Sequence, residues 1–265
     1  MMPPTPSITV SVDLSNPGHF FACCGILGLA DRRFESALGW FDYNGQSFHV
    51  ACQGALPELI TSLVAAEFRP LDPDDPYSTG FTIGEPFRRL AVDWWNTDRT
   101  GAKDLKVWAG TMESFGIANA MRMALKAPEF HSSGILNIGR VVENPEKPGD
   151  KKEPYYFDAR RSPNAHSRDI GFSPNDLRLT TTAHPAVEFF SVIGLQFSRP
   201  APTSANRIYE YFPWPEPIPV SLIGAASCGL LPFQGCHRYR FENWFRTSQK
   251  KHKAFCFATR VSNGD

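Results

Sequence analysis

The sequence lacks several features that mark common classes of protein. No apolar run approaches the ~20 residues that a membrane-spanning helix needs, and residues 1–6 have neither the basic start nor the apolar stretch of a signal peptide. Six cysteines in 265 residues are too few for a disulfide scaffold. We therefore expect a cytoplasmic protein with reduced cysteines and no membrane partner.

Motifs for cofactors and for common catalytic machinery are also missing. Residues 100–103 form only a fragment of a phosphate-binding loop, and no glycine-rich dinucleotide motif follows a strand. The spacing of Cys228, Cys236 and His237 differs from the two to four residues that zinc sites prefer between cysteines. We expect no cofactor and no metal site.

Basic and acidic residues are equal in number, 27 each, but they are distributed unevenly. Residues 1–100 carry 6 basic and 12 acidic side chains, whereas residues 101–265 carry 21 and 15. Because binding of a polyanion depends on local positive potential, we expect it in the second part of the chain. Two other interpretations stay open, namely a solvated basic face and an acidic first part that contacts a basic protein.

The first half of the chain is expected to alternate strands with helices. Asn16-Pro17 supplies an N-cap and a proline at the first helical position, and Asn44-Gly45 predicts a hairpin with a type I′ turn. The expected strands are 8–12, 40–43, 47–51, 80–83 and 88–95, and the expected helices are 20–29, 56–67 and 108–125. The β-α-β-β-α-β order is that of a ferredoxin-like unit. We expect an α+β fold with mixed or antiparallel sheets and helices on one face.

The second half is expected to contain one more apolar helix among several strands. The helix is 185–196, and the strands are 135–142, 155–159, 207–212, 220–223, 238–245 and 254–261. The polar loop 144–154 is the best internal boundary. It would divide the chain into an N-terminal half, 1–143, and a C-terminal half, 155–265, which ends in a basic aromatic hairpin. A single compact unit is the alternative.

A faint repeat relates two of the expected helices. Each begins with a residue followed by proline, at 16–17 and 184–185, contains a pair of phenylalanines, and has a glycine four residues after the second one. Glycine within a helix costs about 1 kcal/mol relative to alanine. Its presence at Gly25 and Gly194 predicts that another backbone approaches closely there, and two related halves would account for the repeat.

Arginine and lysine residues in two segments are the candidates for binding nucleic acid. The loop 160–169 is dense in donors, and guanidinium groups match phosphate oxygens and stack on bases. In 237–246 cations alternate with aromatics, so that a strand would place the cations on one face and the aromatics toward the core. The candidate residues are Arg160, Arg161, Arg168, Arg238, Arg240, Lys250, Lys251 and Lys253.

Three segments resemble a known family. Residues 16–31 read NPGHFFACCGILGLAD, residues 156–161 read YFDARR, and residues 184–200 read HPAVEFFSVIGLQFSRP. They are similar to the small subunit of type I-G (formerly I-U) CRISPR-Cas systems. The resemblance implies a member of a Cascade-like effector complex with ferredoxin-like units related to the RAMP and RRM folds. Its implied partners are other effector subunits and CRISPR RNA, target DNA or both.

The resemblance brings no catalytic residue, which agrees with the missing motifs. The first hypothesis is a non-catalytic subunit that contacts nucleic-acid backbone while base pairing reads the sequence. The alternative is a metal-independent endoribonuclease that processes CRISPR RNA, with His166 as its acid–base residue. The third hypothesis is a scaffold subunit that contacts only proteins.

Overall fold

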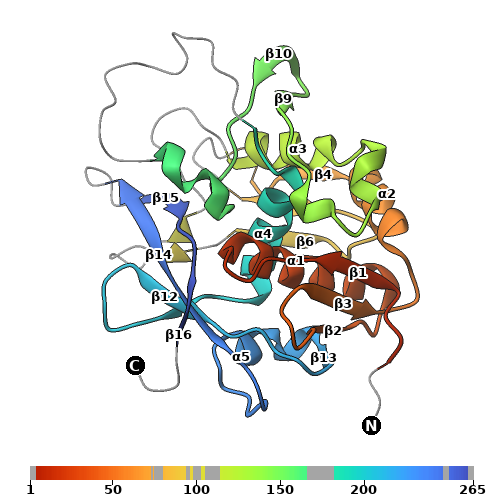
Figure 1. The fold of residues 1–265 in the computed structure, drawn as a ribbon. Coiled ribbons are helices and arrows are strands. Elements are labelled where there is room, and N and C mark those ends of the chain that lie inside the picture. The colour runs from red at the N-terminus through yellow and green to blue at the C-terminus, as the bar shows by residue number, and fades with distance from the viewer. Residues whose placement is uncertain are drawn as a thin grey trace.

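The computed structural model describes residues 4–72, 74, 80–93, 96–97, 103–104, 114–165, 182–246 and 251–261. Within these residues, several small antiparallel sheets surround a pair of central helices (Figure 1). The predicted α+β class with antiparallel sheets is therefore confirmed. None of the described helices is long and apolar enough to cross a bilayer.

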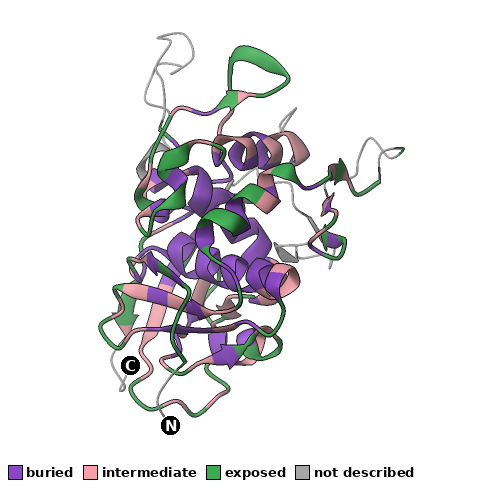
Figure 2. Ribbon diagram, turned by 90° about the vertical axis from the view of Figure 1, so that its right-hand side faces the viewer, coloured by how far each residue is buried: buried purple, intermediate pink, exposed green. Residues whose placement is uncertain are grey.

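Helix α1 (Pro17–Phe34) begins where the sequence predicts. The Asn16 side chain accepts a hydrogen bond from the Gly18 N–H at 3.0 Å, and Pro17 occupies the first turn, where its missing N–H has no helical partner to lose. Every residue from Pro17 through Ala30 is buried. Helix α1 is therefore enclosed by protein on all sides, as Figure 2 shows for the centre of the molecule.

Helix α4 (Pro185–Phe197) lies against α1. A β-carbon on Gly25 would overlap the carbonyl oxygen of Phe190, and a β-carbon on Gly194 would overlap that of Phe21. Only glycine permits such an approach, because a carbonyl oxygen cannot move aside as a side chain can. The predicted close approach of a second backbone is therefore confirmed, and the approaching backbone is that of the other repeat helix.

The two helices run in the same direction. Gly18, near the start of α1, lies beside Val187, and Gly28, six residues before its end, lies beside Phe197 at the end of α4. Both N-termini therefore meet at one end of the pair. This arrangement creates the site described below.

The N-terminal sheet has the order β1-β3-β2-β13, with all pairs antiparallel. Its strands are β1 (Ile8–Ser11), β2 (Leu38–Phe41), β3 (Ser47–Ala51) and β13 (Ile218–Pro219). The predicted hairpin of β2 and β3 is confirmed, but its turn type is wrong. A type I′ turn needs positive φ at both central residues, and of Asn44 and Gly45 only Gly45 has it, at 68°.

The order β1-β3-β2 with α1 between β1 and β2 is the split β-α-β arrangement found in ferredoxin-like units. The next strand, β4 (Phe68–Pro70), does not join this sheet. It pairs instead with β5 (Phe81–Ile83), which pairs with β6 (Leu90–Val92), in a separate sheet. The ferredoxin-like assignment is therefore not confirmed.

The C-terminal sheet is built around one long strand, β14, which pairs with three others. Its strands are β11 (Ala201–Pro202), β12 (Ile208–Tyr211), β14 (Arg238–Arg246), β15 (Lys251–Phe255) and β16 (Thr259–Val261). The predicted basic aromatic hairpin is thus present as β14 and β15. Its second strand is interrupted at residues 256–258, so that β15 pairs with the end of β14 and β16 with its beginning.

Aromatic side chains of α1 contact both large sheets. The ring of Phe20 lies 5.5 Å from Phe41 in β2 and 4.5 Å from Tyr211 in β12. The ring of Phe21 lies 5.9 Å from Phe255 in β15. Residues from both predicted halves therefore contribute to one hydrophobic core, and the division of the chain near residues 144–154 stays a prediction.

The remaining elements surround this centre. They are the helices α2 (Leu56–Ala65), α3 (Ser114–Ala124) and α5 (Ile223–Ser227), the strands β7 (Asn96–Thr97), β8 (Lys103–Asp104), β9 (Glu143–Asn144) and β10 (Lys147–Lys151), and the 3-10 helices η1 (Pro128–His131), η2 (Ile135–Asn137), η3 (Ala159–Ala165) and η4 (Val220–Leu222). Strands β9 and β10 form an exposed hairpin within the predicted polar loop. The first part of the predicted helix 108–125 lies outside the described residues.

Three predicted strands are wrong. Residues 135–142 contain η2, residues 155–159 lead into η3, and residues 220–223 form η4 and the start of α5. In the first two segments consecutive apolar residues are buried, as Ile135 and Leu136 are. A strand with one buried face would alternate instead, so apolar content alone led to the wrong prediction.

Candidate functional site

Three segments far apart in the sequence meet at the fully buried carboxylate of Asp158. The Asn16 Nδ2 donates to one oxygen at 2.7 Å, and the His184 Nδ1 lies 2.6 Å from the other. Arg160 adds its Nε and Nη2, each 2.9 Å from a carboxylate oxygen. These are the three segments that carry the family resemblance, and the structure brings them together at one charge.

The N-termini of both central helices contribute to this site. Asn16 is the N-cap residue of α1 and His184 that of α4, and a helix N-terminus carries a partial positive charge that stabilises a nearby anion. The Asn16 Oδ1 also accepts a hydrogen bond from the Ala159 N–H at 3.0 Å. The repeat in the sequence thus provides two similar helix starts that hold one carboxylate between them.

Asp158 is ionised at neutral pH. Burial by itself would raise the pKa of its carboxyl, but hydrogen bonds from His184 and Arg160, with the charge of Arg160, outweigh burial and hold the pKa well below its ordinary value. Donors surround both oxygens, so the carboxylate has little capacity left for a substrate. Its evident role is to tie η3 to the start of α1 and α4.

A second carboxyl group, that of Glu188, lies beside Asp158. It is fully buried, and its oxygens accept hydrogen bonds from the N–H groups of Phe157 at 3.2 Å and Asp158 at 3.1 Å. Burial, together with the negative charge of Asp158, raises the pKa of Glu188 to about 8. Glu188 therefore carries its proton over most of the neutral range.

His19 completes the inner side of this site. Its Nδ1 accepts a hydrogen bond from the Asp13 N–H at 3.0 Å, and its Nε2 lies 3.2 Å from the Arg160 Nη2. Burial and the charge of Arg160 lower the pKa of His19 to about 4, so the imidazole is neutral at pH 7.

The arginines Arg160 and Arg161, both predicted to bind nucleic acid, lie at the outer edge of this cluster. Arg160 pairs with Asp158, and its side chain is 29% exposed. Arg161 is only 5% exposed, donates to the Thr182 carbonyl at 2.7 Å and pairs with Glu153 at 3.2 Å. Both guanidinium groups thus stabilise the fold, and of the two, Arg160 is the one with surface to offer a ligand.

The other predicted arginines that the structure describes lie on the C-terminal sheet. Arg240 and Arg238 are on the same face of β14, and Glu210 of β12 lies 2.8 Å from the first and 3.9 Å from the second. On the opposite face Phe241 and Asn243 are buried. The predicted alternation of cations and core residues along this strand is therefore confirmed.

The two groups of predicted residues adjoin through β15. The Phe255 N–H donates to the Tyr156 carbonyl at 3.0 Å, and the Phe255 ring lies 5.3 Å from that of Phe157. Strand β15, which carries Lys251 and Lys253, consequently runs beside η3, as Figure 1 shows. Arg168, Lys250 and the alternative catalytic residue His166 lie outside the described residues.

Sequence reasoning missed four polar residues of these sites. Asp158, Asn16 and Glu188 lie in the segments that resemble a known family, and Asn16 is also a predicted helix cap, but none of the three is a predicted site residue, and Glu210 has no predicted role. A carboxylate in the otherwise apolar α4 was the one available signal, because a buried acid needs a partner or a proton. Nothing in the sequence places Glu210 beside two arginines of a strand 30 residues away.

Comparisons with known proteins add no assignment to this geometry. No family model matches the chain, and neither a curated protein nor a solved structure matches it. The residues themselves are therefore the basis for a functional proposal.

Proposed function

We propose that the protein is a non-catalytic, nucleic-acid-binding subunit of an RNA-guided CRISPR surveillance complex that acts in antiviral defence in the cytoplasm. Its ligand is the sugar–phosphate backbone of CRISPR RNA, of target DNA, or of both, and its protein partners are other effector subunits. The three resembling segments support the family, and the arrangement of cations supports the ligand.

The contact between β15 and the segment of η3 is the observation that carries this proposal. Because of this contact, the partly exposed side chain of Arg160 lies near a strand whose sequence contains Lys251 and Lys253. Arg246 of β14 is the register partner of Lys251, so two basic residues occupy paired positions in the hairpin. A polyanion responds to such a local concentration of charge although the molecule as a whole is neutral.

The length of β14 suits a strand of nucleic acid. Its nine residues extend for about 30 Å at ~3.4 Å per residue, which is long enough to face several phosphates of one strand. Arg238 and Arg240 lie on the face of β14 away from buried Phe241 and Asn243, where a phosphate backbone can reach them without displacing buried side chains.

The fold supports a relation to effector subunits in a further respect. Such subunits have ferredoxin-like units, and the β1-β3-β2 order around α1 has the split β-α-β part of that unit. We propose that β4 has left the ancestral sheet and that β13 has joined its other edge.

Glu210 provides the sharpest test, because it pairs with two arginines on the proposed binding face and offsets one of their two positive charges. Glu210→Gln should strengthen binding of a single-stranded RNA and steepen the dependence of affinity on salt. Arg240→Ala should lower the affinity and make its dependence on salt less steep. Each phosphate contact changes the log–log slope by about 0.7 for a single strand. Fluorescence anisotropy of a labelled oligonucleotide across a series of salt concentrations measures these quantities.

Glu58→Gln is the matched control for this experiment. It also releases one arginine, since Glu58 pairs with Arg33 at 2.9 Å, but this pair joins α1 and α2 away from the C-terminal sheet. Replacing Lys250, Lys251 and Lys253 together with alanine should lower the affinity and the slope. The proposal is wrong if Glu210→Gln and the triple variant both bind as the unchanged protein does.

The second candidate function is the metal-independent endoribonuclease. The pair of His184 Nδ1 and Asp158 at 2.6 Å favours it, because a carboxylate that orients a histidine is part of many acid–base sites. Incubation of the purified protein with CRISPR repeat RNA in EDTA separates the two functions. Cleavage that His184→Ala abolishes would establish the nuclease, and intact RNA would exclude it.

A further inference from the structure

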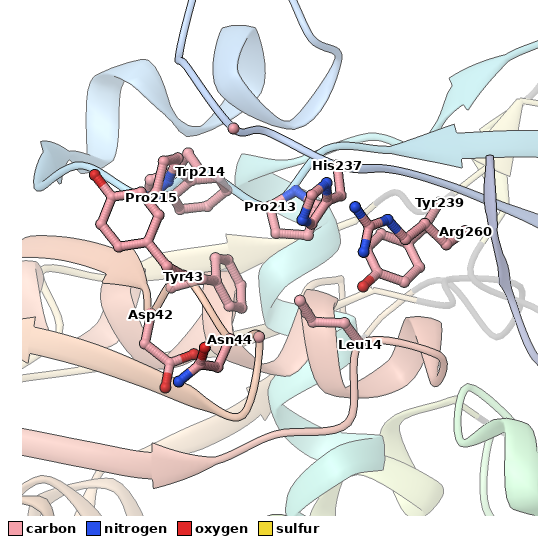
Figure 3. A pocket seen from close by; sticks show the side chains of 13 residues that line it. Leu14, Asp42, Tyr43, Asn44, Pro213, Trp214, Pro215, His237, Tyr239 and Arg260 are labelled. Carbon is pink, nitrogen blue, oxygen red and sulfur yellow. The ribbon is translucent and has the colours of Figure 1, made fainter. Parts of the chain in front are cut away.

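A hollow of 280 Å³ opens between the turn of the β2–β3 hairpin and the C-terminal sheet. Figure 3 shows Tyr43 on one side of it, next to Trp214 and Pro215, and His237, Tyr239 and Arg260 grouped on the other. The walls come from parts of the chain about 200 residues apart, so only the folded protein has this hollow. No role for the hollow follows from the Asp158 cluster or from the outward cations of β14.

One side of the hollow carries positive charge. Arg260 is exposed, and its register partner across β14 and β16 is Tyr239. Among the described residues, Arg260 has no carboxylate within ion-pair distance. Burial and the charge of Arg260 lower the pKa of His237, so the imidazole is neutral at pH 7 and leaves Arg260 as the cation. A guanidinium in this position is suited to a phosphate group.

The other side of the hollow presents an aromatic ring, an amide and the carboxylate of Asp42, which accepts a hydrogen bond from the Gln46 N–H and lies across the hollow from Arg260. Tyr43 is 75% exposed, which is unusual for so large a side chain in a protein that buries most of its aromatics. Asn44 follows it in the turn and also lines the hollow. Exposed aromatic rings stack on bases, and side-chain amides hydrogen-bond to the edge of adenine.

The Tyr239 side of the hollow is held in place. The Tyr239 ring is stacked on that of Tyr211, with centroids 5.5 Å apart and planes at 8°. Tyr211 is fully buried, and its hydroxyl donates to the Leu14 carbonyl. A ligand would therefore meet one wall that is already ordered, which reduces the entropy lost on binding.

We infer that this hollow binds a single nucleotide, with its phosphate on Arg260 and its base against Tyr43. The inference rests on the proposed function and deepens it, because it adds one defined nucleotide position to a surface that otherwise contacts only backbone. The volume is at the low end of small-molecule sites and leaves no room for a second nucleotide. The nucleotide is either free or an unpaired member of a strand.

Two probes distinguish these sources, namely adenosine 5′-monophosphate and a single-stranded adenine oligonucleotide. Isothermal titration calorimetry measures the first and fluorescence anisotropy the second, with Tyr43→Ala, Arg260→Ala and unchanged full-length protein. Loss of one stacked base or one guanidinium contact should weaken binding about tenfold, given ~1–3 kcal/mol for each stacked base. Adenosine, which lacks the phosphate, should bind more weakly than the monophosphate.

Arg69→Ala is the control, because it removes an exposed arginine on β4 that does not line the hollow. If the monophosphate binds and both hollow variants weaken it, the free nucleotide is the ligand. If only the oligonucleotide binds and both variants weaken it, the ligand is a nucleotide within a strand. Oligonucleotide binding that neither variant changes, without binding of the monophosphate, overturns the inference and leaves the proposed function standing.

Two further outcomes also overturn the inference. One is a monophosphate affinity that Tyr43→Ala and Arg260→Ala do not change, which would place the ligand elsewhere. The other is failure of the unchanged protein to bind either probe, which would also contradict the proposed function. Near-ultraviolet circular dichroism of each variant shows whether the aromatic core is intact, so a folding defect cannot imitate a loss of contact.

Discussion

Replacing Gly194 with alanine should destabilise the protein, although alanine is the better helix former. In an open helix this change stabilises by about 1 kcal/mol. Here the new β-carbon would overlap the Phe21 carbonyl oxygen, which belongs to the backbone of a buried helix. Helices α1 and α4 would have to separate, and over-packing costs ~1–3 kcal/mol; we expect the upper end here, because a backbone carbonyl cannot move aside as a side chain can. The net loss in the free energy of unfolding should therefore be about 2 kcal/mol.

Urea unfolding followed by tryptophan fluorescence measures this loss, and a thermal melt should shift by ~4–8 °C for a chain of this size. Gly116→Ala is the matched control, since a β-carbon there would have its nearest neighbour, the Lys152 Nζ, at 3.6 Å. The control should be as stable as the unchanged protein or slightly more so. If Gly194→Ala behaves as the control does, the close crossing of α1 and α4 is refuted.

Two more predictions concern the buried carboxyl groups. Between pH 6.5 and 8 stability should fall as pH rises, because folded Glu188, with a pKa of about 8, retains a proton that the unfolded chain, near 4.5, has released. Above pH 7.5 the slope should be about 1 kcal/mol per pH unit and vanish in Glu188→Gln. Near pH 6.5 His19 contributes a smaller slope of opposite sign, because the folded imidazole, with a pKa of about 4, has released the proton that the unfolded chain, with the ordinary pKa of 6.5, still partly holds. Urea titrations at several pH values measure this dependence. If Glu188→Gln shows the same pH dependence of stability as the unchanged protein, Glu188 is not protonated in the folded state. Asp158→Asn should cost about 3 kcal/mol at pH 7, because it leaves Arg160 and His184 without their anion. This difference should shrink as pH falls below 3.8, where the unfolded carboxyl becomes protonated, and a difference that persists in acid would contradict the account.

Local chemistry made part of the fold predictable. The start of α1 follows from the hydrogen-bonding capacity of Asn16 and the fixed φ of Pro17, which act within a few residues. The close contact at Gly25 and Gly194 was also predictable, because a glycine within an apolar helix lowers stability and implies a compensating contact. That the contact joins the two repeat helices to each other follows only from the structure.

Long-range arrangements could not be predicted from one sequence. The hydrogen bond between Asn16 and Asp158 joins residues 142 positions apart, and nothing local marks either as the other's partner. The position of β4 is a similar case, because its residues suit a strand in any antiparallel sheet and tertiary packing decides which one. The ion pairs and low exposure of Arg160 and Arg161 could not be predicted for the same reason, since the exposure of a loop residue depends on what packs beside the loop.

Ultraviolet cross-linking of single-stranded RNA to the full-length protein, followed by mass spectrometry of the peptides, tests the central claim most directly. A strand that runs along β14 and β15 beside η3 should leave adducts within residues 156–165 and 237–261, and Glu210→Gln should increase their yield. Adducts confined to α2 and α3, or none at low salt, would contradict the account.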